Sequence, residues 1–327
     1  MNLNYTYFYK DRFKLDSLQE LESYDYLISF YAPVDRVLKP LGKIRYNELV
    51  LIKKKSDSIQ SLFPNAQFID VSFEEIDMSS FFIEIQKMVE NKLNGKKVCV
   101  DATGFIVPYL LCMLRVFFEK KVCEFDVIYS EPLKYKGSET TEFTDQFYEV
   151  QQVLGMAGTH TSKNTATSQK DLLIIATGYD HSRIIDVANK KKQSKKVLLF
   201  GFPSLSPSMF QENIIRAKKA EPGLGEDCFK DMDANIYSPA NDPFATAQAI
   251  KNFLELNAKN YENIYFAPLS SKPQTLGIAL YYICEKGWKK KWSIVYPMCK
   301  NYIADCTEGI ANIWRYKFEF SWVINES

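Results

Sequence analysis

The chain has 327 residues, of which 46% are hydrophobic and 25% charged, and its 41 basic side chains nearly balance its 40 acidic ones. This composition is that of an ordinary globular protein and excludes disordered, fibrous and collagen-like chains. A formal net charge of +1 argues against an extended nucleic-acid-binding surface.

The length allows one large α/β domain or two smaller ones, because single hydrophobic cores stop growing near about 250–300 residues. The first residues lack the basic-then-apolar pattern of a signal peptide, and no apolar run reaches the ~18 residues of a membrane span. The seven cysteines include no CxxC pair, which favours a reducing compartment. We therefore expect a cytoplasmic protein without a membrane segment.

Short β-rich segments alternate with helical patterns, which predicts βαβ units and a mainly parallel sheet. Apolar residues between Met78 and Leu93 recur at a spacing of three and four and predict a helix, with Asp77 suited to cap it. Residues 1–135 are expected to form a first Rossmann-like unit. Its predicted strands are 26–31, 48–52, 67–71, 97–101 and 125–130.

The segment 136–170 is polar and rich in Thr, Ser, Gly and Gln. A connection of this length is usually functional, a lid for example, or disordered. We treat it as the connection between the two halves of the chain.

The second half repeats the pattern and predicts a second Rossmann-like unit over residues 171–327. A helix over 242–258 is preceded by Asn241 and opens on Asp242 and Pro243. The closing segment 314–324 alternates aromatic and polar residues, which predicts an additional antiparallel strand at an edge of this unit's sheet. The other predicted strands are 172–176, 196–200, 236–237, 263–267 and 292–296.

The two halves correspond at an offset of about 165 residues. Helix 77–93 corresponds to helix 242–258, and strand 97–101 corresponds to strand 262–266. The fold class predicted is therefore α/β, with two Rossmann-like units and mainly parallel sheets. Descent from one duplicated unit and independent similarity of two such units both remain open.

Polar, turn-rich residues follow most of the predicted strands. In open parallel sheets ligands bind beyond the carboxyl ends of the strands, where loops diverge and helix N-termini present unpaired N–H groups. We therefore predict that a nucleotide or another small anionic ligand binds there. The candidate ligand-binding residues are Asp35, Arg36, Thr103, Gly104, Asp180, Arg183, Asn241, Ser270, Ser271 and Lys272.

Two of these turns have structural alternatives. Ser270, Ser271 and Lys272 combine hydroxyls, helix-terminal N–H groups and a cation, which suit a phosphate or a carboxylate. They equally fit a hydroxyl helix cap beside a solvated lysine. Thr103 and Gly104 fit either a binding turn or a tight corner between strand and helix.

Several common sites are absent from the sequence. It contains no GxxxxGK[ST] motif and no GxGxxG after a strand, which disfavours standard nucleotide triphosphatases and dinucleotide-dependent oxidoreductases. The only histidines are His160 and His181, so no histidine metal cluster is expected. We expect neither a metal nor a cofactor.

Four residues are candidates for catalysis. Glu131 directly follows the strand 125–130, while Asp101 and Asp242 lie at other strand ends. Converging carboxylates act as nucleophile or general base, but they equally recognise ribose hydroxyls in a binding site. His181 follows Asp180 in a strand-to-helix turn and fits an acid–base group or a helix cap. Whether the protein is an enzyme stays open.

Two segments resemble the CRISPR-associated Rossmann-fold (CARF) sensor domains. VDATGFIVPYLLCML, from Val100, resembles their strand, Asp-x-Thr-Gly turn and helix, and IYFAPLSSKPQTLGIAL, from Ile264, resembles their later small-polar-Lys-Pro turn and helix. The resemblance implies binding of cyclic oligoadenylates or related nucleotides at strand ends, usually by a symmetric dimer. It implies that Asp101, Thr103, Gly104, Ser270, Ser271 and Lys272 line a nucleotide site.

The leading hypothesis is a ligand-binding sensor or component of a bacterial antiviral defence system, which works as a homodimer or with partner proteins of that system. The alternative is a hydrolase or transferase that acts on nucleotides or nucleosides through the strand-end carboxylates. A scaffold with a vestigial cleft is the third possibility.

Overall fold

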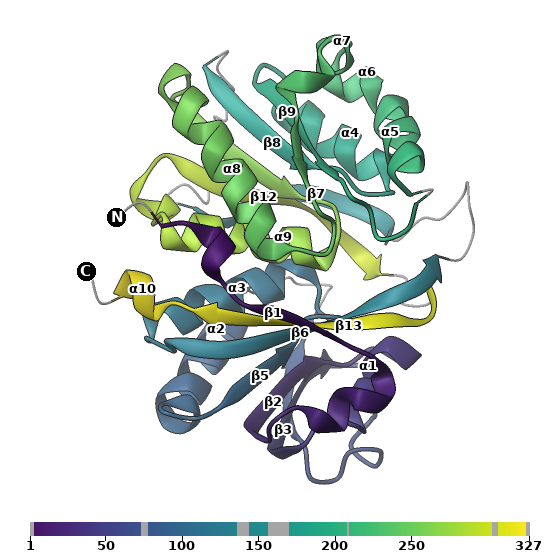
Figure 1. Ribbon diagram of the computed structural model, residues 1–327, viewed down its shortest axis with the longest axis vertical. Coiled ribbons are helices and arrows are strands. Elements are labelled where there is room, and N and C mark those ends of the chain that lie inside the picture. Colours follow the sequence, from purple (N-terminus) through teal and green to yellow (C-terminus); the bar gives the residue numbers. More distant parts are fainter. Residues whose placement is uncertain are drawn as a thin grey trace. The chain divides into compact units, whose positions relative to one another are not determined.

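The computed structural model describes residues 3–72, 78–135, 144–155, 170–207, 209–302 and 307–324. Contacts divide the chain into two compact units, both drawn in Figure 1. We name the units by their sheets. The seven-stranded unit comprises Phe8–Asp145 and Lys300–Ser327, and the six-stranded unit comprises Met1–Tyr7 and Gln146–Cys299.

The sheet of the seven-stranded unit has the order β1-β13-β6-β5-β2-β3-β4. Strands β6, β5, β2, β3 and β4 are parallel to their neighbours in this group, while β13 is antiparallel to both β6 and β1. The strands are β1 (Lys10–Phe13), β2 (Tyr24–Phe30), β3 (Tyr46–Lys54), β4 (Gln67–Val71), β5 (Val98–Asp101), β6 (Glu124–Tyr135) and β13 (Thr307–Glu319).

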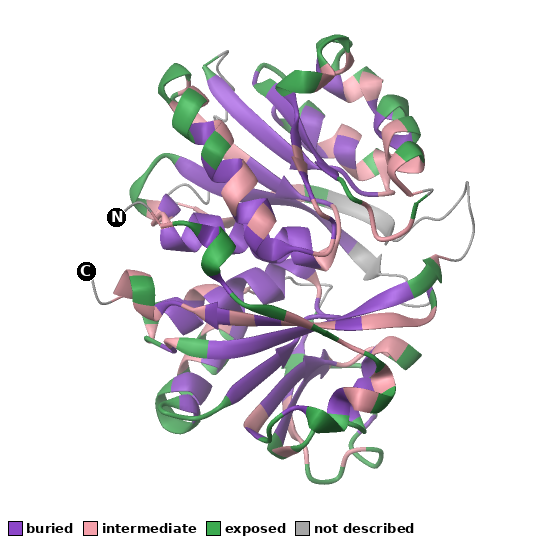
Figure 2. Cartoon of the chain, in the orientation of Figure 1, coloured by how far each residue is buried: buried purple, intermediate pink, exposed green. Residues whose placement is uncertain are grey.

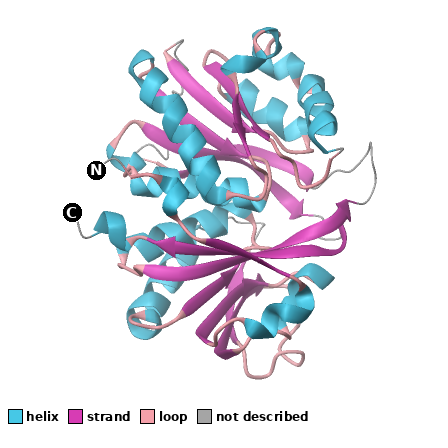
Figure 3. Cartoon of the chain, viewed as in Figure 1, coloured by secondary structure: helices cyan, strands magenta, loops and turns pink. Residues whose placement is uncertain are grey.

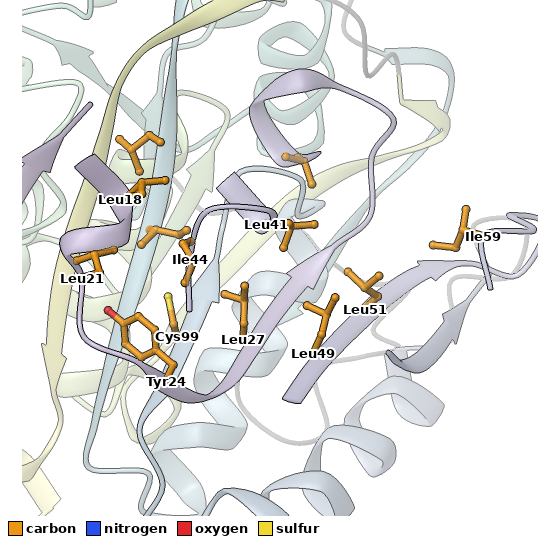
Figure 4. Close-up of a cluster of buried hydrophobic side chains, with 13 residues drawn as sticks. Leu18, Leu21, Tyr24, Leu27, Leu41, Ile44, Leu49, Leu51, Ile59 and Cys99 are labelled. Atoms are coloured by element: carbon orange, nitrogen blue, oxygen red, sulfur yellow. The ribbon is translucent and has the colours of Figure 1, made fainter. Parts of the chain in front are cut away.

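Helices flank this sheet, as Figure 3 shows. Helices α2 and α3 pack against each other, and α1 packs with the 3-10 helix η2. A cluster of buried side chains from η2, α1 and the strands forms the core drawn in Figure 4, with Leu27, Leu51 and Ile313 fully buried. The helices are η2 (Leu15–Glu20), α1 (Asp35–Leu41), α2 (Met78–Met88), the π-helix η3 (Val89–Leu93), α3 (Val107–Glu119) and α10 (Ser321–Ile324).

The sheet of the six-stranded unit has the order β10-β9-β8-β11-β12-β7. Strands β10, β9, β8, β11 and β12 are parallel to their neighbours in this group. Every residue of β8 is buried (Figure 2), as expected for a central strand covered by helices on both faces. The strands are β7 (Thr144–Leu154), β8 (Asp171–Ala176), β9 (Lys195–Gly201), β10 (Ile236–Ser238), β11 (Asn263–Pro268) and β12 (Trp292–Tyr302).

The helices of the six-stranded unit form two groups, α8 with α9 and α4 with α5 and α6. They are η1 (Tyr5–Tyr7), α4 (His181–Lys190), α5 (Met209–Lys219), α6 (Glu221–Leu224), α7 (Asp227–Lys230), η5 (Met232–Ala234), α8 (Pro243–Asn257), η6 (Ala258–Asn260), α9 (Lys272–Cys284) and η7 (Gly287–Lys289). None of the helices in the described ranges is long and apolar enough to cross a lipid bilayer.

The two units repeat one strand order. Numbered along the chain within each unit, the central strands run third, second, first, fourth, fifth, as β4-β3-β2-β5-β6 and as β10-β9-β8-β11-β12. The predicted α/β class with two Rossmann-like units is confirmed. In each unit the order reverses between the first and fourth of these strands, which is where open sheets of this type bind ligands. Descent from one duplicated unit stays a prediction.

The structure differs from the expected boundaries at two places. The C-terminal strand β13 is antiparallel as predicted, but it pairs with β6 of the seven-stranded sheet and is covered on its other side by β1, so it is not an edge strand. Alternation identifies a strand but not its partner, and β6 of the first half continues to Tyr135. The expected connection 136–170 contains β7, which joins the six-stranded sheet. The predicted cap Asp77 lies outside the described residues.

Candidate functional site

Most of the predicted site residues lie at or just beyond the carboxyl ends of strands, and they are divided between the two units. The seven-stranded unit holds Asp35, Arg36, Asp101, Thr103, Gly104 and Glu131, and the six-stranded unit holds Asp180, His181, Arg183, Asn241, Asp242, Ser270, Ser271 and Lys272. We describe the two groups in turn.

In the seven-stranded unit, Asp101 is fully buried at the end of β5. Its carboxylate accepts hydrogen bonds from the backbone N–H of Thr103 at 3.0 Å and from Ser29 Oγ at 3.3 Å. Burial raises the pKa of Asp101 to about 6. Thr103 Oγ1 in turn accepts the backbone N–H of Ser130 at 2.9 Å. Asp101 and Thr103 therefore join β2, β5 and β6 from the inside.

Arg36 and Gly104 also have structural partners. Arg36 Nη1 donates to the carbonyl oxygen of Ser130 at 2.8 Å, and its Nε donates to Thr307 Oγ1 at 2.9 Å, which ties α1 to β6 and β13. A Cβ added at Gly104 would overlap the carbonyl oxygen of Phe30, so glycine permits the close approach of two strand ends.

Asp35 opens α1, a helix of seven residues, and forms an ion pair with Lys39 one turn later at 2.7 Å. The pair is exposed to solvent on both sides, so its contribution to stability is small. Asp35 therefore gives no sign of a ligand.

Glu131 lies within β6, not after it, because the strand extends beyond the predicted end at residue 130. Its side chain is buried and accepts hydrogen bonds from Trp314 Nε1 at 2.6 Å and from Asn312 Nδ2 at 3.3 Å. Lys14 Nζ donates to Asn312 Oδ1 at 2.9 Å. Glu131 thus connects β6 to β13, and its placement directly after a strand end was wrong.

In the six-stranded unit, the loop after β8 is held tightly at the point where the strand order reverses. A Cβ added at Gly178 would overlap the carbonyl oxygen of Leu269, so this glycine lets the loops after β8 and β11 touch. Asn213 Nδ2 donates to the carbonyl oxygen of Thr177 at 2.9 Å, and Arg216 Nη1 donates to that of Tyr179 at 2.9 Å. Side chains of helix α5 therefore fix the position of this loop through hydrogen bonds to its backbone.

Three helices of this unit begin at strand ends, and their caps differ in charge. The carboxylate of Asp180 caps α4 by accepting the N–H of Arg183 at 3.3 Å. The carboxylate of Asp242 caps α8, accepting two backbone N–H groups at 3.0 Å. Helix α9 is capped by the neutral hydroxyl of Ser271, and its first turn holds Lys272 and no acidic residue. An anion is therefore repelled least at α9.

The cap of α9 belongs to a network that fixes its position. Ser271 Oγ donates to the carbonyl oxygen of Ala240 at 2.6 Å and accepts the N–H of Gln274 at 3.3 Å. The buried amide of Gln274 donates to Ser238 Oγ at 3.1 Å, and Ser238 Oγ lies 2.9 Å from Thr246 Oγ1. The strand ends of β10 and β11 are thereby joined.

Several buried polar atoms near this loop pair, Thr275 Oγ1 of α9 among them, lack a hydrogen-bond partner in the described part of the chain. Ser270 Oγ and Asn213 Oδ1 have no hydrogen-bond partner among the described residues. Ser270 lies next to Gly178, and Asn213 holds the residue before it. Buried polar groups in folded proteins are nearly always paired, so such atoms point to a missing water or ligand. In the seven-stranded unit such an atom near the strand ends is Ser130 Oγ, whose residue also accepts a hydrogen bond from Arg36 at its carbonyl oxygen.

The remaining predicted residues surround the start of α4 and α8. His181 is the first residue of α4, and the guanidinium of Arg183 stacks 4.5 Å from the ring centroid of Tyr296. Asn241 is partly buried before the cap residue Asp242. Asp180 and Asp242 act as helix caps.

Sequence reasoning missed three contributors. Gln274 is a buried amide in an otherwise apolar helix, a pattern visible in the sequence KPQTLGIALYYIC. Phe202 follows β9 and is 52% exposed, which a sequence does not reveal. Asn213 reaches the site from the middle of α5, and no local signal marks it.

In the described part of the chain, no group of three or more His, Cys, Asp or Glu is placed to hold a metal ion, and His160 lies outside that part.

No protein-family model matches the chain. No curated protein matches it either. Among solved structures, the chain is similar to a protein of unknown function from Pseudomonas aeruginosa PAO1, with 11% identity, a TM-score of 0.24 and coverage of 87% of this chain and 95% of that one. It is also similar to a candidate universal stress protein from Pseudomonas aeruginosa UCBPP-PA14, with 9% identity, a TM-score of 0.24 and coverage of 86% and 94%. The fold assignment rests on the strand order.

Proposed function

We propose that the six-stranded unit binds a nucleotide or another small anionic ligand where the loops after β8 and β11 meet. The observation that carries this proposal is the combination at the start of α9. Ser270 Oγ is buried with no partner among the described residues, beside a helix N-terminus that has a neutral cap and begins with Lys272. A hydroxyl without a partner in the described part of the chain, a helix N-terminus and a cation together suit a phosphate group.

The seven-stranded unit supports this function less well. The polar groups of Asp101, Thr103 and Arg36 bond to their own chain, and α1 is too short to present a stable helix N-terminus. The proposal therefore assigns the ligand to the later turn of the two that resemble CARF domains. The earlier turn serves as a structural corner.

The enzyme alternative has weaker support. The carboxylates of Asp101, Glu131 and Asp242 are all buried and accept hydrogen bonds within the protein. A carboxylate that acts as nucleophile or general base must reach the substrate. New products from a nucleotide mixture, with turnover lost in Glu131→Gln, would favour the enzyme over the binding protein.

The role of sensor in a bacterial antiviral defence system is part of the proposal and rests on the resemblance to CARF domains. It makes cyclic oligoadenylates the first cyclic ligands to test, alongside mononucleotides and dinucleotides. Ligand-dependent dimer formation, followed by light scattering, tests the homodimer that the resemblance implies.

The binding proposal is tested by isothermal titration calorimetry of the full chain with this nucleotide panel. We expect Lys272→Met to weaken binding about tenfold or more, because hydrogen bonds to charged groups contribute roughly 1.5–3 kcal/mol. Ser270→Ala should also weaken binding, while leaving the ligand-free protein as stable as before or more so, since it removes an unsatisfied buried hydroxyl.

Lys259→Met is the matched control, because Lys259 is exposed in η6, which precedes the amino end of β11. It should bind like the wild type. Absence of binding across the whole panel, or equal losses in Lys259→Met and Lys272→Met, would contradict the proposal.

A further inference from the structure

Phe202 is an exposed aromatic residue at an unusual place. The exposed large apolar side chains described in the six-stranded unit are Tyr7, Phe202, Ile215 and Leu256, with 52% of Phe202 exposed. The other three lie on the helices η1, α5 and α8. Phe202 is the one that lies in a loop at the carboxyl end of a strand, directly after β9. Single exposed apolar residues are common, so this position must be weighed with its surroundings.

The ring of Phe202 is held in place. Its backbone N–H donates to the carbonyl oxygen of Ser238 at 2.7 Å, and the N–H of Ala240 donates to the carbonyl oxygen of Pro203 at 2.9 Å. The ring of Phe210 packs against it with centroids 4.7 Å apart and an angle of 51° between the planes. An aromatic surface fixed before binding loses little entropy when a ligand stacks on it.

The residue before Phe202 lies beside the first turn of α9. A Cβ added at the preceding residue, Gly201, would be 3.0 Å from Ala240 Cβ and 3.6 Å from Gln274 Oε1. Gln274 is in the first turn of α9, and the cap Ser271 donates to the carbonyl oxygen of Ala240. The loop after β9 and the start of α9 are therefore in contact through two neighbours, at the same edge of the sheet.

We infer that Phe202 stacks on the base of a nucleotide whose phosphate lies at Ser271 and Lys272. This inference rests on the proposed function and narrows the ligand to an anion that carries an aromatic ring. An inorganic phosphate or a simple carboxylate uses only the helix N-terminus and leaves half of the Phe202 side chain in water. Every base has a flat π-face, so stacking selects for a nucleotide without fixing which base is bound.

The test compares ligands with and without a base. The full chain is titrated calorimetrically with the four ribonucleoside 5′-monophosphates and with ribose 5-phosphate, which has the same sugar and phosphate but no base. We expect the wild type to bind the nucleotides at least about fivefold more tightly than ribose 5-phosphate. Phe202→Leu should lose this preference while its affinity for ribose 5-phosphate stays unchanged, and Phe202→Trp should keep the preference.

Tyr7→Leu is the matched control, because it removes an exposed aromatic ring of the same unit that lies next to α8, and it should keep the preference. Equal affinity of the wild type for nucleotides and ribose 5-phosphate, or an unchanged preference in Phe202→Leu, overturns the stacking inference and leaves anion binding intact. If neither kind of ligand binds, the proposed function fails and the stacking inference fails with it.

Discussion

Asp101 illustrates how a residue that fits a catalytic pattern is used inside the fold. It lies at a strand end, as the sequence predicts, yet it is fully buried and its carboxylate bonds to Thr103 and Ser29. The sequence alone fits both a catalytic and a structural Asp101, because the residues that enclose it come from three strands far apart in the chain. Only its hydrogen-bond partners distinguish the two roles. Ser130, for example, bonds to Thr103 although the two are 27 positions apart.

The buried carboxyl of Asp101 should make stability depend on pH. Burial raises its pKa to about 6 in the folded protein, against about 3.9 in an unfolded chain. The folded state therefore binds the proton more tightly, and the contribution of Asp101 to the free energy of unfolding is largest below pH ~4 and falls as the pH rises to about 6. Asp101→Asn removes the titrating carboxyl, so the variant does not lose this part of its stability as the pH rises. Relative to the wild type, the variant's free energy of unfolding should rise by about 2 kcal/mol between pH 4 and pH 7, as measured by urea denaturation.

The control for this measurement is Asp16→Asn, which removes one negative charge from an exposed side chain. A difference between Asp101→Asn and wild type that stays constant from pH 4 to pH 7 would show that folding does not raise the pKa of the Asp101 carboxyl.

Lys191 also shows that the sequence does not reveal whether a polar side chain is buried. Lys191 stands in a run of three lysines, a pattern typical of a solvated surface, yet it is buried with its Nζ 3.6 Å from the ring centroid of Tyr265. Burial lowers its pKa to about 8. Charge runs predict exposure only on average, because a long side chain can fold back over a neighbouring ring.

At the scale of elements, the sequence predicts the parallel strands well, because each is a short apolar segment buried on both faces between helices. The predicted strand 67–71 is found at the same residues, and 263–267 is one residue short. β1 was missed, since Lys10–Phe13 is mostly charged, as edge strands often are. The partner of β13 could not be predicted, because pairing between distant segments leaves no local pattern.

The placement of β13 in the seven-stranded unit can be tested through its core residue. Ile313 is fully buried with Leu27, Leu51 and Ile128 in that unit. We expect Ile313→Ala to lower the free energy of unfolding by about 3 kcal/mol, because it removes buried methyl groups and leaves a cavity.

Leu133→Ala on the neighbouring strand β6 is the control, since Leu133 is 63% exposed, and its effect should stay within about 0.5 kcal/mol. Urea denaturation measures both variants. Similar small effects for Ile313→Ala and Leu133→Ala would show that β13 does not contribute to this core.

At the scale of the whole molecule, two units with one strand order differ in what their strand ends do. In the seven-stranded unit, Arg36, Asp101 and Thr103 close the ends onto one another. In the six-stranded unit, the start of α9 keeps a neutral cap, Ser270 Oγ remains without a partner among the described residues, and Phe202 is exposed nearby. The sequence predicts a candidate site at the carboxyl edge of each sheet. The hydrogen-bond partners, which the sequence does not show, distinguish the closed edge from the one that could bind a ligand.

We expect a ligand to bind at the carboxyl edge of the six-stranded sheet and not at that of the seven-stranded sheet. Hydrogen–deuterium exchange of the full chain, measured by mass spectrometry with and without a saturating ribonucleoside 5′-monophosphate, distinguishes the two edges. Binding should slow exchange in peptides that cover 177–181, 201–204 and 269–275, with no change over 101–107. Slower exchange over 101–107 without protection of 269–275, or no change anywhere in the protein, would contradict this expectation.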